Sequence, residues 1–201
     1  MTKTEDVIGL FVDAQIQACI RGRLLREDER ADVCRIALQA GTQVYKLHES
    51  VYEIINLRLL PASGGHSQWI ILKSREWLDA EMPDWRDCQE TPRFAIQDDT
   101  SLRLVGAVQT GDSLALECYR LPMAALCAER DKPEIHVAHH ERLVQWVLHR
   151  VFSVPDNDLY DPVRSKDAEA EFTAYFGPLP DSDLRRSTRH DTHHHVIGYM
   201  A

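Results

Sequence analysis

The spacing of apolar residues changes twice along this chain, and this change constrains the fold more than any other feature. In residues 2–26 the apolar positions recur about every 3.6 residues, which is the period of a helix. In residues 32–121 the period shortens to about two, which is the period of a strand, and after Pro133 the helical period returns. The sequence therefore predicts an α+β fold in which a β unit is inserted between helical segments.

The helical segments carry recognisable start and stop signals. Thr2 precedes Glu5 at the spacing of a capping box. Asp161 is placed to cap a later helix that has Pro162 in its first turn and Gly177 after its last turn. The expected helices cover residues 2–26, 139–153 and 161–176. Packed together, these segments from the two ends of the chain would form a helical bundle.

Residues 32–121 predict an antiparallel β unit of about seven short strands with one small helix among them. The alternation is clear where Ile55, Leu57 and Leu59 fall on one side of a strand. The stretches PASGGHS, DDTS and TGD have the composition of turns. Ser74 is expected to cap the small helix.

Two stretches at the start of the β unit are assigned from their composition. The charged run REDER, residues 26–30, is expected to be a solvated connection. The run VCRIALQ, residues 33–39, is expected to form the first strand, because Cys34, Ile36 and Leu38 would share one face.

These patterns divide the chain into a helical core, a β domain and an extended arm. The helical core comprises residues 1–31 and 122–177, the β domain residues 32–121, and the arm residues 178–201. The helix in residues 139–153 has an apolar stripe wider than one small bundle requires, so part of it is expected to meet a neighbouring subunit. The residues expected at this subunit interface are Trp146, Val147 and Arg150.

Charge and hydropathy exclude several classes of protein. The net charge of −9 argues against gripping nucleic acid through phosphate neutralisation, although an acidic wall still allows DNA to slide past. No run approaches the roughly 18 apolar residues of a membrane span, and residues 1–6 lack the pattern of a signal peptide, so we expect a cytoplasmic product. The five cysteines include no CxxC pair, which favours reduced thiols.

Histidines raise the question of a metal site. His136 and His140 have the spacing of zinc ligands on a helix, but the second histidine of an HExxH motif is missing. A further cluster near the end of the sequence comprises His190, His193, His194 and His195. No nucleophile elbow, triad or phosphate-binding loop is found either. We therefore expect no catalytic residue, no metal and no cofactor.

Two other functions are left open by the residues alone. The first is a metal-dependent hydrolase that uses the histidines. The second is a carbohydrate-binding β module in which tryptophans form the platform, although core or subunit-contact roles suit these side chains as well. The tryptophans concerned are Trp69, Trp77, Trp85 and Trp146.

Because histidine becomes charged near pH 6.5, the histidines of residues 178–201, together with Arg185, Arg186 and Arg189, make the arm the only basic-leaning segment of an acidic chain. Its composition predicts docking to an acidic partner, with arginines forming ion pairs and a short apolar stretch supplying a buried anchor. The docking residues are Arg185, Arg186, Arg189, Val196, Ile197 and Tyr199.

The order of the segments resembles the head-to-tail adaptor, or neck, proteins of tailed bacteriophages. The resemblance is carried by CRIALQAGTQVYKLHESVYEI, WLDAEMPDWRD, DKPEIHVAHHERLVQWVLHRVFSVPDNDLYDP and AEFTAYFGPLPDSDLRR, in that order. It implies a structural virion protein, made in the host cytoplasm, that forms a ring of about twelve copies below the portal. The implied partners are the portal protein, tail or nozzle proteins and passing double-stranded DNA, without a membrane.

One departure from the family concerns the first helix. The stretch TKTEDVIGLFVDAQIQACIRGRLL lacks the tryptophan often found at the start of that helix. The resemblance therefore gives no expectation for how this end of the helix packs.

Overall fold

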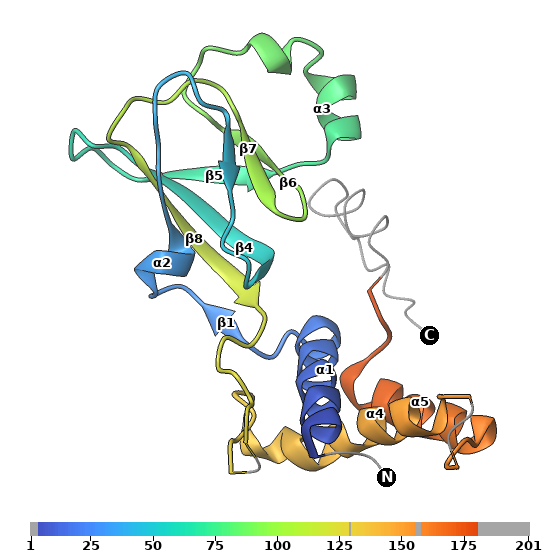
Figure 1. Ribbon diagram of the computed structural model, residues 1–201. Helices are drawn as coiled ribbons and strands as arrows, with labels where there is room; N and C mark the ends of the chain where they lie inside the picture. Colours follow the sequence, from blue (N-terminus) through green and yellow to red (C-terminus); the bar gives the residue numbers. More distant parts are fainter. Residues whose placement is uncertain (1–3, 129, 156–157, 181–201) are drawn as a thin grey trace, which may run out of the picture. The chain divides into compact units, whose positions relative to one another are not determined.

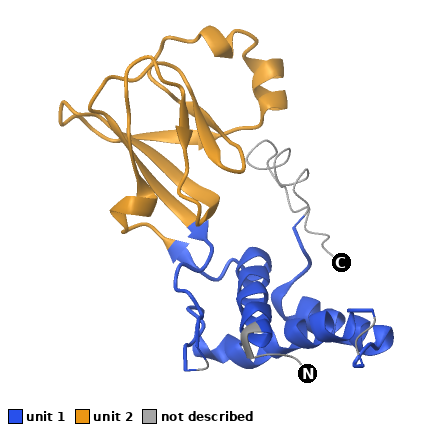
Figure 2. Cartoon of the chain, in the orientation of Figure 1, with its two compact units in different colours: residues 1–26, 119–180 blue, residues 27–118, 181–201 orange. Residues whose placement is uncertain are grey.

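The computed structural model describes residues 4–128, 130–155 and 158–180. The chain divides into two compact units (Figure 2). We call residues 1–26 and 119–180 the helical unit and residues 27–118 the β unit. Helices and strands both contribute, so the predicted α+β class is confirmed.

The helical unit contains α1 (Thr4–Gly22), α4 (His140–Phe152) and α5 (Pro162–Phe176) (Figure 1). Helix α1 ends where Arg23 adopts the left-handed conformation with φ 52°, earlier than the sequence predicts. Asp161 caps α5 by accepting hydrogen bonds from the amides of Val163 and Arg164, both at 3.1 Å. Gly177, with φ 94°, ends α5 as predicted. A 3-10 turn, η2 (Val137–His139), precedes α4.

Aromatic side chains fill the core of the helical unit. Trp146 and Phe172 stack with ring centroids 5.1 Å apart, and Phe172 lies 4.6 Å from Phe176. On α1 the small residues Ala14 and Ala18 are fully buried, and they let the helix backbone approach these large rings. The buried cluster comprises Ala14, Ala18, Cys19, Ile135, Leu143, Trp146, Val147, Phe172 and Phe176.

The strands form one sheet of eight strands within the described residues. Its order is β1-β8-β4-β5-β6-β7-β3, and β2 also pairs with β8. The bounds are β1 Arg26–Glu27, β2 Arg35–Ala37, β3 Val44–Lys46, β4 Val51–Leu60, β5 Gln68–Leu72, β6 Phe94–Gln97, β7 Ser101–Val105 and β8 Ser113–Arg120. The predicted alternation in β4 is confirmed at Leu57 and Leu59, which are buried on either side of the exposed Arg58, but Ile55 is only half-buried and its neighbour Ile54 is fully buried.

The prediction of a wholly antiparallel sheet is wrong at one pair of strands. Strands β5 and β6 are parallel, with Ile71 opposite Phe94. Parallel neighbours need a long crossover, and here it contains α3 (Arg75–Glu81) and the 3-10 turn η1 (Trp85–Asp87). Ser74 caps α3, as predicted, by accepting a hydrogen bond from the amide of Trp77 at 3.1 Å.

The crossover covers one face of the sheet at β6 and β7. Leu78 of α3 and Trp85 of η1 pack against Ile96 and Val105, and Trp77 lies with its ring centroid 5.4 Å from that of Phe94. The opposite face carries a second set of buried apolar side chains. These include Leu57, Leu59, Ile70, Leu72, Leu104 and Leu114.

Two assignments near the start of the β unit are corrected. The charged run 26–30 is not only a connection, because Arg26–Glu27 form β1. The stretch expected as the first strand begins with one helical turn, α2 (Ala31–Cys34), before β2. The neighbours Val33 and Cys34 are both buried, and a strand would turn one of them outward, whereas a helical turn buries both.

The chain passes between the units at residues 26–27 and again at residues 118–119. Close to these points, the amide of Arg120 donates a hydrogen bond to the carbonyl oxygen of Leu25 at 2.9 Å. The incoming strand β1 and the outgoing strand β8 are therefore neighbours.

Candidate interaction surfaces

Polar side chains tie α1 to the other two long helices of the helical unit. Asp13 accepts a hydrogen bond from Nε1 of Trp146 at 2.7 Å, and Nε of Arg150 lies 3.7 Å from the same carboxylate. Arg21 donates to Oγ1 of Thr173 on α5 at 2.8 Å, and its guanidinium lies 5.0 Å from the ring centroid of Trp146. Burial lowers the pKa of Arg21, and the nearby Glu169 opposes that shift. These contacts fix the three helices relative to one another.

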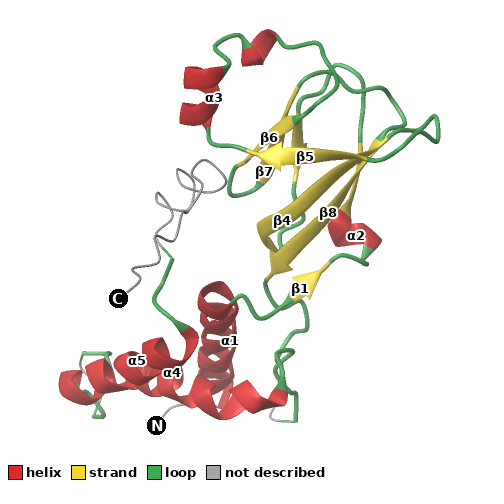
Figure 3. Cartoon of the chain, turned by 180° about the vertical axis from the view of Figure 1, so that it is seen from behind, coloured by secondary structure: helices red, strands yellow, loops and turns green. Residues whose placement is uncertain are grey.

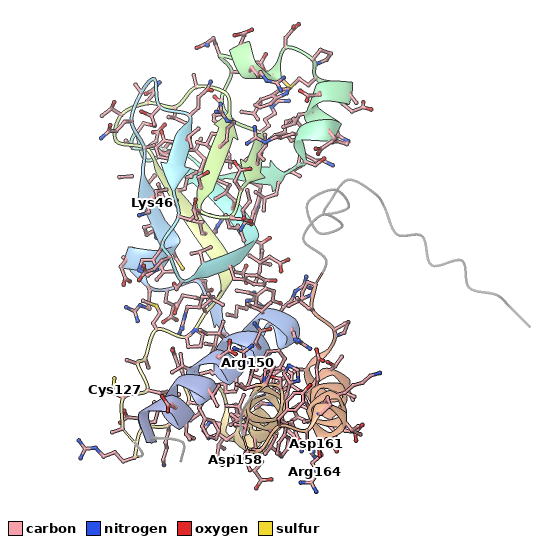
Figure 4. All side chains as sticks on the ribbon, turned by 45° about the vertical axis from the view of Figure 1, so that its right-hand side comes forward. Lys46, Cys127, Arg150, Asp158, Asp161 and Arg164 are labelled. Atoms are coloured by element: carbon pink, nitrogen blue, oxygen red, sulfur yellow. The ribbon has the colours of Figure 1, made fainter. Side chains whose placement is uncertain are left out.

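The residues predicted at a subunit interface divide into two kinds. Trp146 and Val147 are each 8% exposed and belong to the core of their own subunit. The side chain of Arg150 is 52% exposed and faces α1 at the surface (Figure 4). On the same helix Val144 is 41% exposed. The interface itself stays a prediction, and the exposed residues of this helix that a neighbour could reach are Glu141, Arg142, Val144 and Arg150.

A partly buried ion pair fixes the segment between β8 and α4. Nη2 of Arg120 donates to Glu134 at 2.5 Å, and the amides of Met123 and Ala124 donate to the other carboxylate oxygen. The amide of Glu134 in turn donates to Oε1 of Gln15 on α1 at 2.6 Å. Burial alone would raise the pKa of Glu134, but these hydrogen bonds outweigh it, so the pKa is lowered.

The turn between α4 and α5 exposes apolar side chains beside carboxylates. Val154, Leu159 and Tyr160 are each about half exposed, and Val163 is 68% exposed. Asp158 and Asp161 lie at the same end of the helix pair (Figure 4). We call this surface the α4–α5 tip; it comprises Val154, Asp158, Leu159, Tyr160, Asp161 and Val163. The sequence analysis missed it, although two apolar residues within the loop PDNDLYDP were a usable signal.

A second exposed apolar surface lies on the central strand β5. Trp69 is 60% exposed and Ile71 is 48% exposed, because the alternation of the strand points both away from the buried Ile70. The guanidinium of Arg58 lies 5.2 Å from the ring centroid of Trp69, its partner across the β4–β5 pair. We call Arg58, Trp69 and Ile71 the β5 patch. Its charged group is cationic.

Both histidines of the suggested zinc pair take part in local hydrogen bonds. Nδ1 of His136 accepts from the amide of Ala138, which is a capping role, and Nε2 of His140 donates to the carbonyl oxygen of Ile135 at 2.9 Å. His136 precedes α4, so the helical geometry of a zinc pair does not arise. Among the residues that the structure describes, no group of three or more potential ligands could hold a metal ion. The cluster His190, His193, His194 and His195 lies outside those residues.

Within the described residues, neither the metal-dependent hydrolase nor the carbohydrate-binding module gains a site. Trp85 and Trp146 are buried and Trp77 packs against Phe94, so Trp69 alone is exposed among the tryptophans. Burial raises the pKa of the Cys19 thiol to about 12, which keeps it protonated. A hollow of about 190 Å³ lies beside α3, where Arg75 and Asp98 form an ion pair at 2.8 Å.

The predicted docking residues Arg185, Arg186, Arg189, Val196, Ile197 and Tyr199 lie outside the described residues. Across the described ranges, no helix is both long and apolar enough to cross a membrane.

Comparison with known protein families identifies a match over most of the chain. The family model described as SU10 adaptor protein matches residues 2–194, which span both units. No curated protein matches the chain.

Proposed function

The chain belongs to the SU10 adaptor protein family, and from this premise we propose that it is a structural virion protein that forms a ring below the portal, joins the phage head to the tail and lines the DNA channel. The observation that carries the proposal is the family match over residues 2–194. Membership of an adaptor family implies a structural, non-enzymatic component of the phage particle that contacts other head and tail components. The ring, its place and its channel are the proposed part.

The proposed partners follow the resemblance noted in the sequence. They are the portal protein on one side, tail or nozzle proteins on the other, and other copies of this chain in a ring of about twelve. Residues 178–201 are proposed as the docking arm. Arg185, Arg186 and Arg189 would form ion pairs, and Val196, Ile197 and Tyr199 would supply the apolar anchor.

Contact between copies is proposed to be heterologous, since one surface meeting a different surface on the next copy closes a ring. Exposed side chains of the helical unit are available for such a contact. On α4 the exposed residues include Arg150 and Val144, and Trp146 and Val147 pack in the core beneath them.

The distribution of charge supports a wall past which DNA slides. Residues 27–118 contain sixteen Asp and Glu against nine Lys and Arg, so the β unit holds most of the net charge of −9. Carboxylates repel phosphate at short range, and salt screens the repulsion beyond roughly 10 Å. Duplex DNA mixed with assembled rings at physiological salt should not bind tightly; tight binding would exclude the sliding wall.

The mass of the assembled protein tests the central proposal. If the chain forms a ring, native mass spectrometry of the full chain, alone or mixed with portal particles, should show an assembly of hundreds of kilodaltons. A chain that stays at 23.1 kDa in both mixtures would contradict the ring. Images of virions labelled on this protein should then place the label at the neck.

A further inference from the structure

We propose that Cys34 and Cys118 form a disulfide bond when the protein meets a low-molecular-weight disulfide as oxidant, and that this bond staples the two ends of the β unit together. The pairing itself is independent of the ring proposed above. Its timing rests on the proposed function, because a virion component passes from the reducing interior of the host cell, where disulfides are rare, to an oxidising medium.

Two thiols that are far apart in the sequence lie together in the β unit. Cys34 is the last residue of α2, and Cys118 lies near the end of β8. Both side chains are fully buried, and a side-chain hydrogen bond joins the two thiols. A disulfide requires the sulfur atoms to close from this contact to about 2.05 Å. The pair therefore already has the proximity from which the bond can form.

Strand pairing explains why these two cysteines meet. Arg35, the residue after Cys34, lies opposite Ala115 in the antiparallel pair of β2 with β8. Along β8, alternation places Cys118 on the same buried face as Leu116. Figures 1 and 3 show α2 beside β8 within the β unit. The two cysteines are distant in sequence, so no spacing motif announces the pair.

The other three cysteines have different surroundings. Cys19 packs in the core of the helical unit, and Cys88 packs against the cluster that α3 forms with β6 and β7. Cys127 is exposed in the segment between β8 and α4. The structure therefore selects one pair from the five cysteines.

The bond would secure the edge at which the β unit opens most easily. The chain enters this unit at residue 27 and leaves it at residue 118. The strands that follow the entry are short, since β1 has two residues and β2 has three. Short edge strands open at low cost. A pull applied through the two connections to the helical unit would then load the bond instead of the pairing of β2 with β8.

Oxidation proceeds by two thiol–disulfide exchanges. The thiolate of Cys34 attacks one sulfur of the small disulfide, whose sulfur–sulfur bond breaks and releases one small thiolate. The thiolate of Cys118 then attacks the sulfur of Cys34, forms the protein disulfide and releases the second small thiolate. The two protons from the cysteine thiols end on the two released thiolates, so one disulfide is reduced as the other forms.

Burial controls the rate of the first exchange. It raises the pKa of Cys34, Glu27 adds to the shift, and the hydrogen bond with Cys118 opposes it only in part. The thiolate is therefore scarce while α2 is closed. Since α2 is a single turn beside the short strands, its opening would expose Cys34 to the oxidant. We expect oxidation of the folded chain over minutes to hours rather than seconds.

Controlled oxidation of the folded full chain tests the inference. Cys127→Ser first removes the exposed thiol, and the chain is incubated in mixtures of oxidised and reduced glutathione. Samples are then denatured in N-ethylmaleimide, and their peptides are mapped by mass spectrometry. We expect two peptides joined through residues 34 and 118. Hydrogen exchange in β2 and β8 should slow at least about tenfold on oxidation and recover when a reductant is added.

Matched variants separate the pair from the remaining thiols. Cys34→Ala and Cys118→Ala should each abolish both the link and the slowing of hydrogen exchange. Cys88→Ala, which changes a cysteine outside the pair, should leave both unchanged. Circular dichroism under reducing conditions checks that each variant keeps its fold.

Phage particles test the timing. Cells quenched with acid before lysis and then denatured in N-ethylmaleimide should show both cysteines labelled. Particles held in medium that contains oxidised glutathione should show the link. Released particles that keep both thiols, or a link already present before lysis, would contradict the timing.

Four other results overturn the inference. Thiols that stay unlinked in the most oxidising mixture, even in the low urea concentrations that open α2, refute the pair. A lasting glutathione adduct, or a link to Cys19 or Cys88 instead, does the same. A link that leaves hydrogen exchange unchanged refutes the staple. Rings that form while both thiols stay unlinked refute the pair and leave the proposed function standing, whereas a link without rings contradicts the ring alone.

Discussion

The helical unit and the β unit are built in opposite ways. The described part of the β unit is one continuous stretch, residues 27–118, whereas the helical unit joins residues 1–26 to residues 119–180. Its core therefore forms only after α1 meets helices more than a hundred residues later, and that loop closure carries an entropic cost. The β unit needs no such closure with residues outside itself. The comparison teaches that the inserted unit is the more self-sufficient in folding.

The two units also differ in charge and in how their elements are joined. The helical unit is close to neutral by sequence and uses side-chain ties such as Asp13 to Trp146 and Arg21 to Thr173. The β unit carries most of the negative charge and is joined by backbone pairs between strands. Substitutions of side chains should therefore affect the helical unit more sharply, and changes of backbone conformation the β unit.

Truncating a core ring should give the largest effect, confined to the helical unit. Phe172 is fully buried against Trp146 and Phe176, so Phe172→Ala should lower the free energy of unfolding of this unit by about 3–5 kcal/mol. Hydrogen exchange should show faster exchange in α4 and α5 and unchanged protection in β4 and β8. Equal loss of protection in both units would mean that they unfold as one.

A backbone change should give the matching effect in the β unit. Gly106 has φ 131°, and a Cβ at this position would lie 2.3 Å from the carbonyl oxygen of Glu90. Gly106→Ala should therefore cost about 2–4 kcal/mol, measured by the same exchange experiment in β6 and β7. Gly41→Ala is the control, because Gly41 also has positive φ but open space around it, and only strain of about 1–2 kcal/mol is expected. Similar losses for both variants would contradict the clash.

Acid should weaken the helical unit through Glu134. The folded state lowers the pKa of this carboxyl below 4.5, so it binds a proton less readily than the unfolded chain does. Its stabilising contribution is complete above about pH 4.5 and is lost as the pH falls through the folded pKa. Glu134→Gln should cost about 1–3 kcal/mol at neutral pH and make stability less dependent on pH in the acid range. Urea unfolding at several pH values measures both, and an unchanged acid slope would argue against this role.

Removing one helix cap in each unit should give the smallest effects. Asp161→Ala in α5 and Ser74→Ala in α3 each remove a side chain that accepts a backbone amide, which costs about 1 kcal/mol. Each loss should appear in the hydrogen exchange of its own unit only. Replacement by Asn at either position retains an acceptor and should recover most of the stability.

Features that depend on near neighbours in sequence were predicted well. Ser74, Asp161 and Gly177 act where the sequence places them, because a cap or stop involves only a few adjacent residues. The alternation in β4 likewise identifies Leu57 and Leu59 as inward-facing, although it does not predict the burial of Ile54.

Features that depend on distant partners were not accessible from the sequence. Strands β5 and β6 are parallel because of where the crossover places β6. The alternation of apolar residues within each strand does not reveal the direction of its neighbour. The turn that contains Val33 and Cys34 is helical because both of these adjacent side chains are buried. This burial depends on the surrounding fold and not on the local sequence. Trp146 and Val147 were expected at a subunit interface, and that role stays a prediction. Their burial within one subunit depends on contacts with α1 and α5, which are distant in sequence.

The hydrogen bond between Arg120 and Leu25 places the two ends of the inserted unit side by side. An insertion with adjoining ends can be exchanged as a cassette, because its replacement requires only that the new ends also adjoin. Recombination between related genomes could thus supply a different β unit while the host helices keep their own core. The sequence of the β unit can then change rapidly while the packing of the helical unit is retained.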